Sequence, residues 1–238
     1  ETQLPRNGTE REVQAALAGC GMLVESEEVD DERLRVFLEG AAEGLPGTMQ
    51  VTLMPTLACN LACTYCFQKD HPAQNRMQGQ TEASTVEWVL RKVAEAGSHR
   101  MLVHYFGGEP LTRKDFVLRT AGIFQAAMNA RGGIFEWELT TNGVGLDSGF
   151  VEALSAFGEG AIKVTLDGAK ETHDAARVYR DGRGTFDEIL SNLVRVAHSH
   201  PEVKLRLGGN FRPGQVESYQ RLLLRLKNTG PILFTGDA

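Results

Sequence analysis

Six short apolar stretches alternate along the chain with longer stretches of helical periodicity, and this alternation restricts the possible folds more than any other feature. The apolar stretches are rich in β-branched and aromatic residues, as strands are. Because parallel neighbours need a crossover connection, which is usually a helix, the pattern predicts a parallel sheet. The predicted strands are Met49–Met54, Met101–Phe106, Ile134–Thr140, Ala161–Leu166, Val203–Leu207 and Pro231–Phe234.

Helices are predicted in the intervals, where apolar residues recur every three or four positions. Six strand–helix units predict an α/β fold, a partial (β/α)6 TIM-like barrel, in which the loops that leave the carboxyl ends of the strands build the active site. Thr185-Phe-Asp-Glu188 has the pattern of a capping box at the start of one helix. The predicted helices are Ser84–Ala96, Thr112–Ala130, Asp147–Phe157, Thr185–His198 and Gln215–Lys227.

The first 47 residues lack this alternation and predict a short helical N-terminal extension (1–47), followed by the barrel domain (48–238). Thr9-Glu-Arg-Glu12 resembles a capping box, and the turn Leu45-Pro-Gly47 marks the boundary.

The net charge of −6 argues against a nucleic-acid partner that is held through phosphate contacts. No apolar run is long enough to span a bilayer, so no membrane association is expected. Four cysteines in 238 residues are too few for a disulfide framework, and reduced thiols are typical of a cytoplasmic protein.

Three of the four cysteines, Cys59, Cys63 and Cys66, follow the first predicted strand with the spacing C-x-x-x-C-x-x-C. Three thiolates are one fewer than the four that normally close an iron–sulfur cluster, so one iron would be left open to an outside ligand. A structural zinc site is the alternative. It needs four ligands, and His71 and His104 could complete such a site. Cys20 stands alone and is interpreted as a small apolar residue.

Polar motifs follow the next two strands. In Gly107-Gly108-Glu109-Pro110, the glycine pair permits close backbone approach to a ligand and the carboxylate can accept hydrogen bonds from an amine, although a simple turn is the alternative. Thr140-Thr141-Asn142-Gly143 is either an Asn-Gly turn or a group of polar side chains at the barrel mouth.

The fourth strand leads into Thr165-Leu-Asp-Gly168 and then His173-Asp174 and Arg177. A guanidinium can bind a carboxylate through two parallel N–H bonds, which makes Arg177 a candidate for anion binding. We expect Asp167, His173 and Asp174 to brace the loop.

Taken in order, these motifs resemble the radical SAM superfamily over about Gln50 to Ala238, and in particular its SPASM/twitch-type maturases, which include anaerobic sulfatase maturases. The last motif is similar to the family's S-x-D-G-x-x-x-x-H-D-x-x-R, with Thr165 in place of Ser. The resemblance implies that Cys59, Cys63 and Cys66 bind a [4Fe–4S] cluster and that S-adenosylmethionine (SAM) chelates the fourth iron. The SAM contacts that it implies are Tyr65, Gly107, Gly108, Glu109, Pro110, Thr141, Asn142, Thr165 and Arg177.

The resemblance further implies an enzyme that reductively cleaves SAM and uses the 5′-deoxyadenosyl radical to crosslink or oxidise a ribosomally made peptide or protein. A flavodoxin- or ferredoxin-type donor would supply the electron. Two alternatives stay open: a small-metabolite substrate, or a non-catalytic metal-bound binding module. Because such maturases usually carry a cysteine-rich C-terminal segment, we expect the native gene to continue past Ala238 into one that binds auxiliary clusters.

Overall fold

The computed structural model describes Ala15 and residues 26–43, 47–68, 75–210, 212 and 214–228. The chain divides into two compact units, Glu1–Pro46 and Gly47–Ala238. The described part of the first unit is essentially one helix, α2 (Glu27–Glu43), whose first turn is acidic. Negative charge there complements the partial positive charge of a helix amino terminus. The capping-box pattern at Thr9–Glu12 and the lone Cys20 lie outside the described residues.

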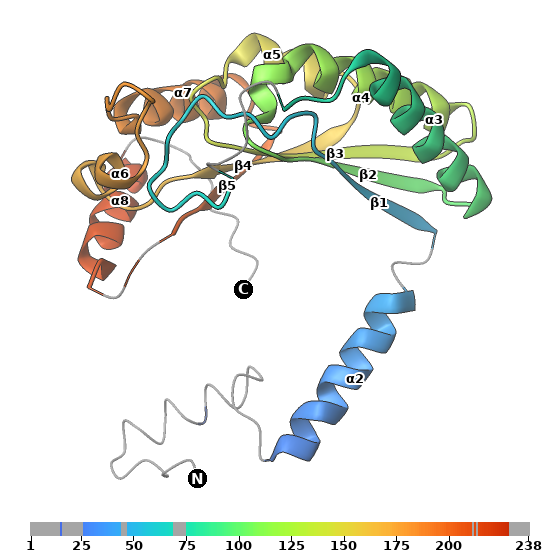
Figure 1. Ribbon diagram of the computed structural model, residues 1–238, viewed down its shortest axis with the longest axis horizontal. Helices are drawn as coiled ribbons and strands as arrows, with labels where there is room; N and C mark the ends of the chain where they lie inside the picture. The colour runs from blue at the N-terminus through green and yellow to red at the C-terminus, as the bar shows by residue number, and fades with distance from the viewer. Residues whose placement is uncertain are drawn as a thin grey trace. The chain divides into compact units, whose positions relative to one another are not determined.

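The second unit is built on a sheet of five described strands that follow one another in chain order, each parallel to the next (Figure 1). This arrangement confirms the predicted α/β architecture of a partial TIM-like barrel. The strand predicted at Pro231–Phe234 lies outside the described residues. The strands are β1 (Thr48–Leu53), β2 (Arg100–Tyr105), β3 (Ile134–Thr141), β4 (Glu159–Thr165) and β5 (Lys204–Gly208).

Helices α3, α4, α5 and α7 lie together on one side of this sheet, while α6 and α8 lie near β5 (Figure 1). A 3₁₀ turn, η1 (Pro110–Arg113), precedes α4, so the helix predicted from Thr112 begins later, at Lys114. The short helix α6 was not predicted, because seven residues are too few to show a period. The helices are α3 (Gly79–Glu95), α4 (Lys114–Asn129), α5 (Ser148–Ser155), α6 (Lys170–Ala176), α7 (Phe186–Ser199) and α8 (Val216–Asn228).

The two faces of the sheet differ in chemistry because side chains alternate along each strand. In β3, Phe135, Trp137 and Leu139 are buried in the core beneath the helices. The intervening Glu136 and Glu138 point to the opposite face, which we call the inner face, and are only partly buried. A barrel interior is ordinarily filled by bulky branched side chains, so a polar inner face is available for ligand binding.

The capping-box prediction at Thr185–Glu188 is wrong. Thr185 precedes α7, but its side chain makes no capping bond. Instead, Asp174 Oδ1 at the end of α6 accepts the backbone N–H groups of Thr185 and Phe186, at 2.8 and 2.9 Å. A carboxylate brought by the preceding helix therefore caps α7 and fixes the loop between α6 and α7.

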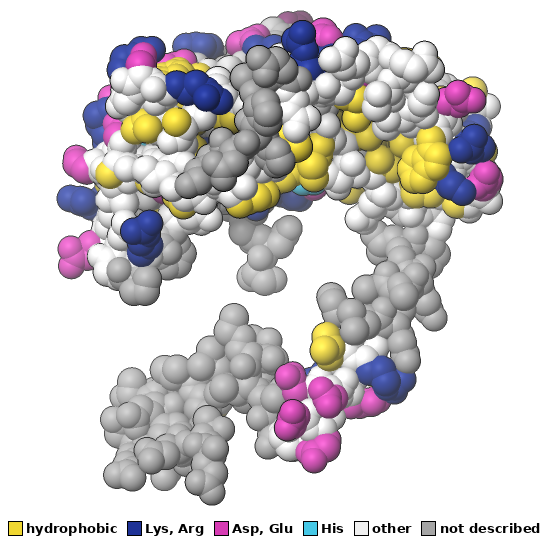
Figure 2. Space-filling model, in the orientation of Figure 1, with side chains coloured by type: hydrophobic (Ala, Val, Ile, Leu, Met, Phe, Trp, Pro, Cys, Tyr) yellow, Lys and Arg dark blue, Asp and Glu magenta, His cyan; other side chains and the backbone are white. Residues whose placement is uncertain are grey.

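None of the described helices is long and apolar enough to cross a membrane. On the face of the Gly47–Ala238 unit that Figure 2 draws, the described acidic and basic side chains are interspersed along the edges. This mixture of signs is typical of a surface that does not bind polyanions.

Candidate functional site

The cysteine loop follows β1 and is held on one side by the Gly107–Pro110 turn. The N–H groups of Gly108 and Glu109 donate to the carbonyl oxygens of Thr56 and Ala58, at 2.9 and 3.0 Å. A Cβ on Gly108 would lie 2.3 Å from the Ala58 oxygen, and Gly107 has a φ of 125°. The glycine pair thus allows the backbone of this turn to approach the backbone of the cysteine loop closely. The sequence pattern alone predicted only a close approach of backbone to a ligand.

The segment after α6 holds the cysteine loop on its other side. The N–H groups of Ala62 and Thr64 donate to the carbonyl oxygens of Val178 and Ala176, at 2.8 and 2.9 Å. The Arg180 guanidinium donates to the Cys59 carbonyl oxygen at 3.0 Å. Loops that follow three different strands are thereby joined around the cysteines at the carboxyl end of the sheet.

The three cysteines are free thiols, each half-buried. Burial raises the pKa of Cys59 to about 11 and also raises the pKa of Cys63, which the charge of Arg177 partly opposes. The Leu61 N–H and the Asn142 amide donate to Cys59 Sγ, at 3.4 and 3.7 Å. Donors of this kind stabilise a thiolate, and bound iron would supply the remaining positive charge.

No three Cys, His, Asp or Glu side chains among the described residues are arranged to hold a metal ion. This does not conflict with a cluster, because each cysteine would bind a different iron and the sulfur atoms need not converge on one point. His104, proposed as a zinc ligand, lies in β2 and bonds Thr140 through Nε2 at 2.8 Å. His71 lies outside the described residues.

Glu109 is fully buried, and burial raises the pKa of its carboxyl group. Its Oε1 accepts the Leu111 N–H and the Thr141 hydroxyl, at 2.9 and 2.7 Å, while Oε2 accepts the Asn142 N–H at 2.7 Å. The carboxylate therefore joins the loops after β2 and β3. One acceptor position remains on Oε2, which is where an amine could still bind. That Glu109 binds the SAM amino group stays a prediction.

Tyr65, between the second and third cysteines, is the centre of a second network. Its hydroxyl donates to Asp167 Oδ2 and accepts from Arg177 Nη1 at 2.7 Å and from the Asn210 amide at 3.2 Å. Burial raises the pKa of Tyr65 to about 12, so the phenol stays neutral. The sequence singled out Tyr65 and Arg177 separately but gave no sign of Asn210, whose position depends on the chain folding back after β5.

His173 and Asp174 brace the loop, as expected. The Asp167 N–H donates to His173 Nδ1 at 3.2 Å, and Nε2 lies 3.0 Å from Thr185 Oγ1, which itself donates to the Arg177 carbonyl oxygen. This pattern assigns the proton of a neutral imidazole to Nε2. Burial, reinforced by the charge of Arg177, lowers the pKa of His173 to about 4.

The remaining predicted residues lie at the same end of the sheet. Pro110 is buried at the start of η1, and Thr165 is the last residue of β4, in register with Gly208 of β5. Asn142 is buried and donates from its amide to Asn60 Oδ1 at 2.8 Å. The structure thus brings all the predicted cysteine and SAM residues to the loops or strand ends at this edge.

One buried donor tests whether these residues fit a cofactor that carries a carboxylate. Arg177 is 8% exposed, yet its Nε has no hydrogen-bond partner among the described residues. An unpaired buried donor is costly, and the carboxylate of SAM would supply the missing acceptor. Together with the thiols that favour a bound cation, this donor set fits a [4Fe–4S] cluster with SAM.

The sequence profile described as the Radical SAM superfamily matches residues 53–209. GTP 3′,8-cyclase of Clostridium perfringens (strain SM101 / Type A) is 33% identical over 150 residues, 62% of this chain and 42% of the relative. The cysteine-type anaerobic sulfatase-maturating enzyme of Clostridium novyi is 26% identical over 138 residues, 57% of this chain and 36% of the relative. The chain therefore spans less than half the length of these curated relatives.

Two solved structures share the fold. That of anSMEcpe with bound AdoMet (SAM) superposes with a TM-score of 0.64 at 22% identity, over 76% of this chain and 49% of that one. Streptococcus suis SuiB bound to S-adenosylmethionine gives 0.57 at 16% identity, over 93% of this chain and 49% of that one. The same two enzymes also occur with a bound Cp18Cys peptide and with the precursor peptide SuiA.

Proposed function

The chain belongs to the radical SAM superfamily and works with a [4Fe–4S] cluster and SAM, and we propose that it modifies a ribosomally made peptide or protein. The cluster would supply the electron that cleaves SAM, and SAM the 5′-deoxyadenosyl radical that abstracts hydrogen from the substrate. Everything else in the reaction falls to the protein, which must hold the reactants and exclude competing reactions.

The residues of the site divide this work. Cys59, Cys63 and Cys66 would hold the cluster, and Arg177, with its free Nε, would bind the SAM carboxylate. Tyr65 orients the Arg177 guanidinium through its hydroxyl. The neutral, fully bonded His173 supports this loop and is not in a position to act as a base in chemistry.

The chemistry of the inner face carries the proposal of a peptide substrate. Six charged residues on β3, β4 and β5 balance one another in sign; three of them are exposed and three are partly buried. Three cations offset three carboxylates there, so these strands carry no net positive charge that would attract a triphosphate such as that of GTP. A polypeptide, with mixed and mostly neutral groups, needs no such attraction. The six residues are Glu136, Glu138, Glu159, Lys163, Lys204 and Arg206.

The structural neighbours add support, because anSMEcpe and SuiB both bind peptides. A small-metabolite substrate is the second candidate. It is favoured by sequence, since the GTP 3′,8-cyclases, at 31–34% identity, exceed the 26% of the sulfatase-maturating enzyme. The two candidates differ in the molecule that donates hydrogen, which can be measured directly.

We propose a flavodoxin- or ferredoxin-type protein as the electron donor and the cytoplasm as the location. The support for both is chemical: the cluster needs a low-potential electron, and the three described cysteines are free thiols of the kind that a reducing compartment preserves.

Isotope transfer tests the substrate class without knowledge of the substrate. The anaerobically reconstituted protein would receive SAM, a reductant, and either a perdeuterated digest of cellular protein or perdeuterated GTP. We expect deuterium in the 5′-deoxyadenosine formed with the peptides and none with GTP. Deuterium from GTP alone would overturn the proposal in favour of the second candidate. The Cys63→Ala protein, which should not cleave SAM, is the control for deuterium that enters by exchange with no enzymatic reaction.

A further inference from the structure

We propose that Lys163 on the inner face anchors the peptide substrate by pairing with the carboxylate of an Asp or Glu side chain. This inference rests on the proposed function, because it specifies which peptides the site would take. It concerns a part of the sheet that contributes nothing to the cysteine loop or to the networks around Tyr65 and Glu109.

Lys163 lies in the middle of a row of polar residues that crosses three strands. The strand register places Thr140 of β3 and Arg206 of β5 on either side of it. His104 and Glu138 form the neighbouring row one step towards the amino ends, and His104 Nε2 bonds Thr140. Cross-strand neighbours of this kind lie close enough for their side chains to interact.

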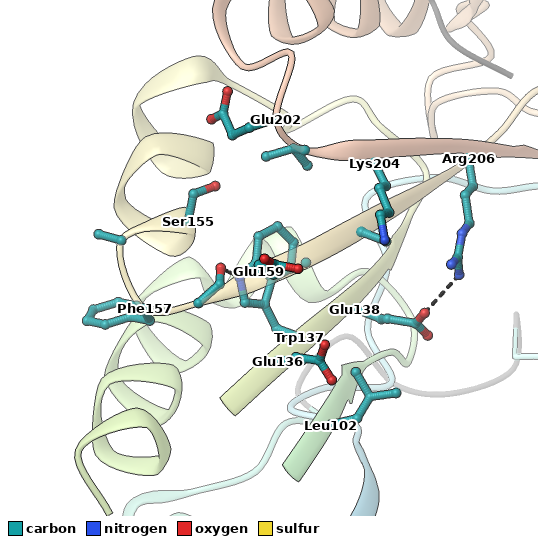
Figure 3. Close-up of a pocket in the computed structure, with 15 residues that line it drawn as sticks. Leu102, Glu136, Trp137, Glu138, Ser155, Phe157, Glu159, Glu202, Lys204 and Arg206 are labelled. Atoms are coloured by element: carbon teal, nitrogen blue, oxygen red, sulfur yellow. Dashed lines mark hydrogen bonds and ion pairs between the residues drawn. The ribbon is translucent and has the colours of Figure 1, made fainter. Parts of the chain in front are cut away.

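Among these groups, Lys163 is the unpaired cation nearest the cofactor end of the sheet. Lys204, next to Ala161 in the neighbouring row, also has no ion pair among the described residues but lies one step farther from that end. Arg206 Nη1 is already paired with Glu138 Oε1 at 2.8 Å (Figure 3). Lys163 is exposed, and no described carboxylate lies within 4.0 Å of its ammonium group. His104 does not add a second charge, because burial lowers its pKa; Glu138 opposes this shift and Lys163 adds to it.

The position of Lys163 also restricts its reach. A Cβ on Gly208 would lie 2.6 Å from Lys163 Cε, so the lysine stem lies across the glycine and a larger residue would displace it. A lysine stem that lies along the sheet keeps its ammonium over the inner face. One compact positive charge beside a neutralised ion pair matches the single negative charge of one carboxylate.

The distance from Lys163 to the cofactor end suits a substrate anchor. Thr165 is two residues further along β4, which is about 7 Å for an extended strand. An acidic side chain held at Lys163 would place the adjacent residues of a peptide at the edge where the cysteine loop lies. The anchored residue itself would stay outside the reacting position.

Towards the amino ends of the strands the inner face continues into a cavity of about 680 Å³, whose lining includes Leu102, Glu136, Glu138, Lys204 and Arg206 (Figure 3). This volume is in the range of ligand sites and can hold several residues of a peptide. Lys163 therefore stands between the cavity and the cofactor edge, along the path that a bound peptide would take.

The test uses peptide pools as probes for the cluster-loaded, SAM-bound protein. The two main pools are acetylated and amidated pentapeptides, Ac-X-X-Asp-X-X-NH₂ and Ac-X-X-Asn-X-X-NH₂, where X is an equimolar mixture of neutral residues. A third pool has the Asn core and a free C-terminal carboxylate. Peptide that stays with the protein during ultrafiltration is quantified by mass spectrometry, which needs no turnover.

We expect retention of the Asp pool to exceed that of the Asn pool by about two- to fivefold, because one exposed ion pair gives a modest preference. The preference should vanish in Lys163→Gln and persist in Lys163→Arg. Lys92→Gln is the matched control, since Lys92 is paired with Glu95 on the surface of α3. SAM binding should be equal in all four proteins.

Three results would overturn the inference: equal retention of the Asp and Asn pools, a preference that survives in Lys163→Gln, or selective retention of the pool with the free carboxyl terminus. The first and third would leave the proposed function intact if peptides donate deuterium to 5′-deoxyadenosine. Deuterium from GTP and none from peptides would reject the proposed function itself, so the two failures are distinguishable.

Discussion

Arg177 Nη1 donates to the Tyr65 hydroxyl at 2.7 Å, and this bond joins the segment after α6 to the loop that carries the three cysteines. The two residues are 112 positions apart. The same hydroxyl donates to Asp167 at the end of β4. A single phenol therefore fixes the orientation of the guanidinium that we assign to SAM, and it does so without contributing a ligand to the iron.

Tyr65→Phe should weaken SAM binding and leave the cluster intact. Loss of the hydroxyl removes hydrogen bonds to two charged groups, which costs about 1.5 kcal/mol or roughly tenfold in Kd. Iron content and a SAM titration of the same reconstituted sample separate the two effects. A Tyr65→Phe protein with less iron and normal affinity for SAM would show that the residue acts on the cysteine loop instead.

Arg177→Ala should lower the affinity for SAM about ten- to a hundredfold, because it removes a buried charged donor. Arg183→Ala is the matched control, since Arg183 is exposed and pairs with Asp181 in the neighbouring turn. Equilibrium binding to the reconstituted proteins measures both. Equal affinities in the two variants would contradict the assignment of the free Nε to SAM.

Gly108→Ala should disturb the cysteine loop, because the new methyl group would meet the carbonyl oxygens of Ala58 and Leu57 at 2.3 and 2.4 Å. We expect a loss of about 1–3 kcal/mol in stability and a reduced iron content after reconstitution. A methyl group on Gly79 would meet no atom within 4 Å, so Gly79→Ala should match the unaltered protein. Full iron loading of Gly108→Ala would mean that the loop can shift without consequence.

The stability of the protein should fall in mild acid because of His173. Its pKa is 6.5 in the unfolded chain and about 4 in the folded one, where burial and then Arg177 disfavour the imidazolium ion. Between these values the unfolded chain binds more protons, so the free energy of unfolding falls as the pH is lowered through this window. Between pH 7 and pH 5 the loss is about 2 kcal/mol.

Urea unfolding of the anaerobic, cluster-loaded protein and of His173→Gln measures this contribution as a difference in slope against pH. The slope should be smaller in His173→Gln even if the variant is less stable throughout. Identical slopes would mean that His173 is protonated in the folded state or does not titrate in this range.

The sequence predicted the sheet and the cysteine site because both depend on local patterns. Apolar strands, helical periods and the spacing of Cys59, Cys63 and Cys66 are visible within a few residues of one another. The cap of α7 was mispredicted for the opposite reason. Thr185 has the residue type of a cap, but its hydroxyl donates to the Arg177 carbonyl oxygen instead. Asp174, from a helix that sequence periodicity did not reveal, accepts the Thr185 N–H that Glu188 would accept in a capping box.

Three other features depended on tertiary contacts. The use of Gly108 for packing against the cysteine loop, the bonds of Glu109 to the loop after β3, and the junction of Tyr65 with Arg177 all join segments distant in the chain. The polar inner face, by contrast, has a local signal in the sequence. In Phe135-Glu-Trp-Glu-Leu139 the strict alternation of apolar and acidic residues is typical of a strand with one uncovered face.

The central claim is that Cys59, Cys63 and Cys66 hold a cluster that cleaves SAM, and iron content together with 5′-deoxyadenosine formation tests it most directly. Reconstituted under anaerobic conditions, the 238-residue chain should bind about four iron atoms at this site and form 5′-deoxyadenosine on reduction with SAM. Each single Cys→Ala variant at these positions should lose both properties, while Cys20→Ala should keep them. A Cys63→Ala protein that retains a full cluster and cleaves SAM would contradict the account.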